Sequence, residues 1–137
     1  MNNQLYFFCA LLAIVGGAFS FYFHSVYRGW INHRQFWIPS FCELNSNQCI
    51  SIVDTKYGRL LGIPNAFVGI FLFLIYAIIL ISTALNYIDP IIPRFVGGFT
   101  ILLGLYLIYG LFRLKVACKI CLLVHFLNAI IFFIQLI

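Results

Sequence analysis

The stretch LYFFCALLAIVGGAFSFYF, residues 5–23, contains no charged side chain and predicts a helix that crosses a membrane. At about 1.5 Å of rise per residue, a helix of this length spans the hydrocarbon core of a bilayer. A cleaved signal peptide is the weaker interpretation, because no Lys or Arg precedes the run and the run is long for a signal core. We therefore interpret residues 5–25 as a first membrane span.

Three further windows without charged residues follow, at 60–88, 95–112 and 120–137. Their apolar residues run on without the alternation that the strands of a membrane β-barrel require. The expected fold is therefore an all-α membrane protein, a four-transmembrane-helix bundle. We expect one membrane domain over residues 1–137, with spans of about 5–25, 64–86, 95–112 and 117–136.

The composition agrees with a membrane protein and excludes several other classes. Of 137 residues, 64% are hydrophobic and 8% are charged, which leaves too few charges to hydrate the surface of a soluble domain. The net charge of +5 comes from basic residues scattered between apolar runs, and these form no basic stripe. We therefore expect membrane lipid as a partner, and no nucleic acid.

The connection between the first two spans, residues 26–63, is long, polar and rich in aromatic residues, which favours an ordered cap on the membrane surface. With four spans, this connection and the one between the last two spans lie on the same side of the membrane. Cys42, Cys49, Cys118 and Cys121 therefore share one face, and we expect a cysteine-bearing cap outside the membrane.

The second cysteine pair has the spacing of a redox-active motif. Cys118 and Cys121 open the fourth span, and a separation of three residues on a helix brings both sulfur atoms to one side, close enough for a reducible disulfide. An isolated CxxC is also half of many zinc sites. The second pair on the same face favours the redox interpretation. Cys9 lies deep in the first span, where we expect it to serve packing.

Polar residues follow the CxxC on the same helix. His125 lies four residues after Cys121 and Asn128 three residues further on, so they can share one face. Such residues usually face the bundle interior, where hydrogen bonds between helices are the simpler explanation. Asn65 is either a helix cap or a further polar group at that depth. Together, Cys121, His125 and Asn65 predict a mostly apolar pocket with a thiol and two hydrogen-bonding groups, as a quinone with two carbonyls requires.

The chain resembles the vitamin K epoxide reductase family, including its bacterial quinone-linked members. The residues that carry the resemblance are the loop cysteine pair Cys42 and Cys49, then Thr55, Tyr57, Gly58, Gly62, Pro64, Asn65 and Gly69, and finally Cys118 and Cys121. It covers nearly the whole chain and is strongest from Cys42 to Gly69 and in the fourth span. It implies a four-helix bundle around a quinone (ubiquinone, menaquinone or a related compound), with no metal. It also implies that electrons come from a thioredoxin-like partner as disulfides are made.

The resemblance also implies roles for the cysteines. Cys42 would exchange with the partner protein, Cys49 would relay electrons to Cys118, and Cys121 would reduce the quinone. The thioredoxin-like domain fused to many bacterial members is absent from these 137 residues, so we expect a separate partner protein.

Further residues would bind the quinone. Asn65 falls where the family has an Asn that hydrogen-bonds a quinone carbonyl, and Thr55 falls where a Ser or Thr is usual. Tyr57 belongs to the same segment, and we group it with the quinone-binding residues. His125 stands where the animal members have a Tyr that contacts the substrate, which is a departure from the family pattern.

Two indications of membrane orientation conflict. The cysteine side carries most of the basic residues, namely Arg28, Arg34, Lys56, Arg59, Arg113, Lys115 and Lys119, whereas the opposite side carries Arg94. The positive-inside rule would place the cysteines in the cytoplasm. Disulfide formation belongs in an oxidising compartment. We follow the chemistry and expect a multi-pass protein of the bacterial inner membrane with its cysteine face in the periplasm; the inverted topology is the alternative.

Two other classes of function remain open from the sequence. Paired thiols beside membrane helices also suit a carrier of soft metals such as mercury or copper. A non-catalytic membrane protein with static disulfides or one structural zinc site is the other alternative. A carrier requires thiols along its path and only Cys9 lies deep, whereas static bridges do not require a CxxC at a helix start. The redox enzyme is therefore favoured.

Overall fold

A computed structural model of the chain describes residues 3–32, 34–38, 59, 62–115 and 118–137. Within these residues the structure consists of four helices without strands, α1 (Asn3–Tyr27), α3 (Asn65–Ala84), α4 (Ile91–Leu114) and α5 (Lys119–Leu136). All four are long and apolar enough to cross a membrane, which confirms the predicted all-α membrane fold. Most of the predicted cap lies outside the described residues.

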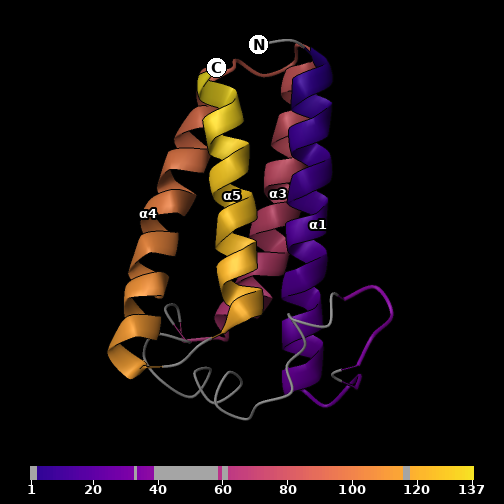
Figure 1. Ribbon diagram of the computed structural model, residues 1–137. Coiled ribbons are helices and arrows are strands. Elements are labelled where there is room, and N and C mark those ends of the chain that lie inside the picture. The colour runs from indigo at the N-terminus through magenta and orange to yellow at the C-terminus, as the bar shows by residue number, and fades with distance from the viewer. Residues whose placement is uncertain (1–2, 33, 39–58, 60–61, 116–117) are drawn as a thin grey trace.

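The helices run up and down, so that their ends gather at two faces (Figure 1). Both chain termini lie at one end, together with the short connection from α3 to α4. The end of α1, the start of α3, the end of α4 and the start of α5 meet at the opposite end. Cys118 directly precedes α5, so this opposite end is the cysteine end of the bundle.

Local sequence signals determine where α4 and α5 begin. The N–H of Ile91 donates to Asp89 Oδ1 at 2.9 Å, and Pro90 occupies the N-cap position. α4 therefore begins at Ile91, before Arg94, whereas the predicted span began after Arg94. At the other end, Lys115 adopts a left-handed conformation (φ 54°) that terminates the helix. Cys118 is extended (φ −111°, ψ 96°), and α5 continues directly from it.

Small residues allow close contact between helices. A Cβ atom on Gly16 of α1 would lie 2.7 Å from the ring of Phe73 in α3, so the glycine leaves the space that the ring fills. Small residues at such positions are typical of helix pairs in membranes, where the contact between helices is driven by packing. α1 packs along α3, and α5 packs against both α1 and α4, whereas α3 and α4 contact each other only slightly.

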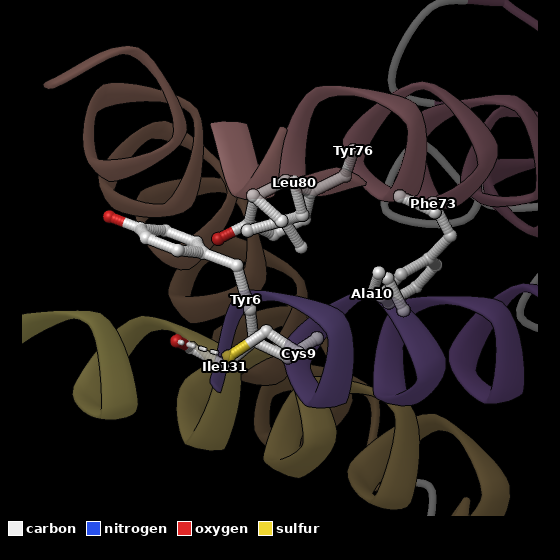
Figure 2. Close-up of a cluster of buried hydrophobic side chains, with 10 residues drawn as sticks. Tyr6, Cys9, Ala10, Phe73, Tyr76, Leu80 and Ile131 are labelled. Atoms are coloured by element: carbon white, nitrogen blue, oxygen red, sulfur yellow. Dashed lines mark hydrogen bonds between the residues drawn. The ribbon is translucent and has the colours of Figure 1, made fainter. Parts of the chain in front are cut away.

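The end of the bundle opposite Cys118 and Cys121 has a buried core of its own, which contains Cys9. This residue is fully buried, and its sulfur lies 4.0 Å from the backbone carbonyl oxygen of Ile131 in α5 (Figure 2). Tyr6, Ala10, Phe73, Tyr76 and Leu80 belong to the same cluster. Cys9 therefore serves packing, as the sequence predicts.

The outer surface of the bundle is strongly apolar. Phe95, Leu102 and Phe126, among many other large hydrophobic side chains, are exposed on the outside of the helices. An apolar surface of this extent is incompatible with water and is expected where lipid chains contact the protein. The chain is therefore a multi-pass membrane protein whose helices contact lipid.

Candidate functional site

A cavity of about 320 Å³ lies inside the bundle and is lined by all four helices. Most of its wall is apolar, with Phe19 and Phe23 of α1, Leu72 of α3 and Leu107 of α4 among the residues that line it. The polar groups on the wall are Ser20, Asn65, Tyr76, Thr100, Cys121, His125 and Asn128. A cavity of this size with few polar groups is typical of a site for a small apolar ligand.

The CxxC lies at the cysteine end of this cavity. Cys118 is fully buried and disulfide-bonded, whereas Cys121 is a free thiol. The two sulfur atoms are 2.7 Å apart, and Cys121 lines the cavity. A free thiol thus lies beside a disulfide sulfur, where thiol-disulfide exchange can take place, and also borders the ligand space.

Asn65 and His125 line the same cavity as Cys121, so the structure brings together the three residues that the sequence groups in one pocket. Asn65 is the first residue of α3, and the N-cap position before it belongs to Pro64, which offers no side-chain hydrogen bond. His125 lies one helical turn after Cys121. Its imidazole packs on Gly104 of α4, where a Cβ atom would come within 2.9 Å of His125 Nδ1.

A second polar contact in the cavity joins α4 to α5. The single hydroxyl hydrogen of Thr100 is shared between two acceptors, Asn128 Oδ1 at 3.1 Å from Oγ1 and the backbone carbonyl oxygen of Gly97 at 2.9 Å. Asn128 fulfils the expectation of a hydrogen bond between helices. Thr100 was not among the sequence candidates, although it is the one Thr or Ser in the charge-free window 95–112, which was the signal that could have singled it out.

The remaining predicted site residues are not placed by the structure. Cys42, Cys49, Thr55 and Tyr57 lie outside the described residues. Among the residues that are described, no group of three or more His, Cys, Asp or Glu side chains could hold a metal ion.

The fold and the site define a multi-pass membrane protein with a cysteine pair at the mouth of an apolar cavity inside a four-helix bundle. Comparison with known families identifies it further: the model of the Vitamin K epoxide reductase family matches residues 7–136, and the chain belongs to this family. The resemblance found in the sequence is thereby confirmed, as is the assignment to the oxidoreductases. Neither the curated proteins nor the solved structures gave a match.

Proposed function

We propose that this protein is a quinone-dependent thiol:disulfide oxidoreductase, which oxidises a thioredoxin-like partner and transfers two electrons to a membrane quinone. The observation that carries the proposal is the position of Cys121. Its free thiol lies 2.7 Å from the disulfide-bonded Cys118 and borders an apolar cavity that also contains Asn65 and His125.

The residues that line the cavity suit a quinone ring. Apolar side chains from four helices would surround the ring, and Asn65 and His125 can hydrogen-bond to carbonyl oxygens. A quinone bound here supplies the capacity to accept two electrons and two protons. Asn65 and His125 would orient the ring and stabilise negative charge on oxygen during reduction. Following the family pattern, Thr55 and Tyr57 complete the set of quinone-binding residues in our proposal.

The cysteines carry the electrons by exchange of disulfides, beginning from a Cys49–Cys118 bond with Cys42 and Cys121 as thiols. Cys42 attacks Cys49, so a Cys42–Cys49 bond forms and the sulfur of Cys118 is released. Cys118 and Cys121 then become joined in a disulfide. One disulfide has been replaced by two, and the two electrons and two protons lost from Cys42 and Cys121 match the capacity of one quinone.

The partner protein restores the starting state. Its two thiols reduce the Cys42–Cys49 bond and leave as a disulfide. The freed Cys49 attacks the Cys118–Cys121 bond, which regenerates the Cys49–Cys118 disulfide and the thiol of Cys121. The observed state, in which Cys118 is disulfide-bonded and Cys121 is a free thiol, is the state that this cycle requires before quinone reduction.

The function is tested by adding a reduced thioredoxin-like protein and ubiquinone-1 to the purified protein in lipid vesicles and following quinone consumption. We expect Cys121→Ala to abolish consumption. Cys9→Ala is the matched control, because Cys9 is the other free thiol among the described residues and does not line the cavity, and it should retain activity. An active Cys121→Ala variant would contradict the proposal.

We further propose that the protein lies in the bacterial inner membrane with its cysteine end in the periplasm, because disulfides form and persist in oxidising compartments. Labelling whole cells with a membrane-impermeant thiol reagent tests the orientation. The proposed orientation gives labelling of the loop cysteines before lysis, and labelling only after lysis means that the protein is inverted.

A further inference from the structure

We propose that Asn128, oriented by Thr100, donates a hydrogen bond to the inner carbonyl of the quinone and so determines how deep in the cavity the ring binds. This inference rests on the function proposed above and adds a specificity-determining residue to it. It starts from a contact in the cavity that joins polar side chains of α4 and α5, the hydrogen bond from Thr100 to Asn128.

The contacts between α4 and α5 order the cavity by depth. Moving away from the cysteine end, His125 packs on Gly104, Asn128 bonds to Thr100, and Phe132 packs against Gly97. These pairs follow one antiparallel register. Asn128 therefore lies one turn deeper than His125 and two turns deeper than Cys121, and it still faces the cavity.

The hydrogen bond from Thr100 leaves the amide donors of Asn128 available. Thr100 Oγ1 donates to Asn128 Oδ1, so the oxygen of the amide is held by α4. The two N–H groups on Nδ2 have no hydrogen-bond partner among the described residues. Asn128 is only 5% exposed and borders the cavity, so the space next to it is the ligand space. A ligand with a hydrogen-bond acceptor at this depth can accept a hydrogen bond from its amide.

The depth of Asn128 matches the dimensions of a para-quinone. The two carbonyl oxygens of such a ring are about 5 Å apart, because two C=O bonds of about 1.2 Å extend from opposite corners of a six-membered ring. A hydrogen bond of about 3 Å at each end places the two donors about 11 Å apart. Cys121 and Asn128 are seven residues apart, which corresponds to about 10 Å along the helix axis.

The outer donor lies at the level of Cys121. Asn65 and Cys121 occupy the first turns of α3 and α5, and both helices begin at the cysteine end (Figure 1). A ring held between Asn65 and Asn128 would lie against the thiol of Cys121, which is the position that electron transfer requires. His125, one turn nearer the cysteine end than Asn128, would then donate to the same inner carbonyl oxygen, which can accept two hydrogen bonds.

Binding of ubiquinone-1 to purified wild type, Asn128→Leu and Thr100→Val tests the inference, with two readouts. The first is the dissociation constant from a calorimetric titration. We expect the dissociation constant to rise about tenfold for Asn128→Leu, which is the factor that one lost hydrogen bond gives. For Thr100→Val we expect a rise of about threefold, because the amide of Asn128 is retained but is no longer oriented by the Thr100 hydroxyl. Thr83→Val is the matched control, because the Thr83 hydroxyl is buried in α3, bonds to the carbonyl of Ile79 and does not line the cavity.

The second readout is the infrared difference spectrum of the bound quinone, in which a hydrogen bond lowers the stretching frequency of a carbonyl. Wild type and Thr83→Val should show both carbonyl bands lowered, and Asn128→Leu should show one band shifted back toward the frequency of free quinone. A wild-type dissociation constant and a wild-type spectrum in Asn128→Leu would overturn the inference. If Asn128→Leu does not fold, Thr100→Val decides, and wild-type binding with an unchanged spectrum in that variant overturns it.

The same measurements separate this inference from the proposed function. If the wild-type protein neither binds nor reduces ubiquinone-1, the proposed function is wrong and the inference is lost with it. If the wild type reduces ubiquinone-1 while the Asn128 and Thr100 variants bind it as the wild type does, only the role of Asn128 is wrong.

Discussion

Replacement of Gly104 by Ala is a direct test of whether the position of His125 matters for quinone reduction. Gly104 lies in α4 and lines the cavity, and the imidazole of His125 packs against its backbone. The added Cβ atom would lie 2.9 Å from His125 Nδ1 and 3.6 Å from Cε1. Because the glycine is helical, the backbone itself tolerates the substitution, and the effect falls on the neighbouring side chain.

The size of the effect follows from these distances. An ordinary contact with a Cβ atom is 3.4–4 Å, so the imidazole has to move by about half an ångström or more. Overpacking of this kind typically costs about 1–3 kcal/mol. A displacement of about 1 Å at a reacting centre can reduce the rate by about 100-fold. We therefore expect Gly104→Ala to lower the rate of ubiquinone-1 reduction by about 10-fold or more.

Gly98→Ala in the same helix is the matched control. A Cβ atom at Gly98 meets only Phe132 Cε2, at 3.9 Å, which is an ordinary contact. Both substitutions reduce the entropy of the unfolded chain in the same way, with a gain of roughly 0.5–1 kcal/mol in a helix interior. The assay compares quinone reduction by the two variants at equal amounts of folded protein. Equal activity of Gly104→Ala and Gly98→Ala would refute the role given to His125.

Two further predictions concern stability at the end of the bundle away from the cysteines. Gly97→Ala would place a Cβ atom 2.7 Å from the hydroxyl oxygen of Tyr76 and 2.9 Å from Phe132. We therefore expect the free energy of unfolding, measured by denaturation in mixed micelles, to fall by about 1–3 kcal/mol. A variant as stable as the wild type would contradict this contact. Tyr76→Phe removes the 2.6 Å hydrogen bond that Gln135 Nε2 donates to the Tyr76 hydroxyl and should cost about 1–3 kcal/mol. Since it also removes one of the atoms that a Cβ at Gly97 would meet, the double variant should be destabilised by less than the sum of the single ones, and additive effects would show that the two sites do not interact.

The four helices could be predicted from the sequence because apolar runs and membrane thickness determine them almost alone. The ends of the helices were less predictable. The third span was bounded at Arg94 by its charge, but α4 begins at Ile91, where Asp89 and Pro90 form a start signal. The limit of an apolar window marks where a charge appears, whereas the end of a helix depends on local capping.

The candidate site was predictable only in part. The sequence could group three residues of the site. His125 shares a helix face with Cys121 by helical spacing, and Asn65 follows the loop that lies on the same side of the membrane as Cys121. Thr100 could be singled out as the one Thr or Ser in its apolar window, but its pairing with Asn128 could not be predicted, because the sequence does not show which residue of α4 faces which residue of α5. That register emerges from the packing of whole helices, and the contact between Gly104 and His125 depends on it in the same way.

The most direct test of the central claim is a count of thiols in a single turnover. Protein in the observed redox state, with Cys121 free, is mixed with one equivalent of ubiquinone-1 without oxygen, quenched with an alkylating reagent at intervals and analysed by mass spectrometry. We predict that alkylation of Cys121 is lost in step with quinol formation, with two thiols lost per quinol, while Cys9 remains reactive after denaturation. Formation of quinol while Cys121 stays fully alkylated would contradict the claim that this thiol gives its electrons to the quinone.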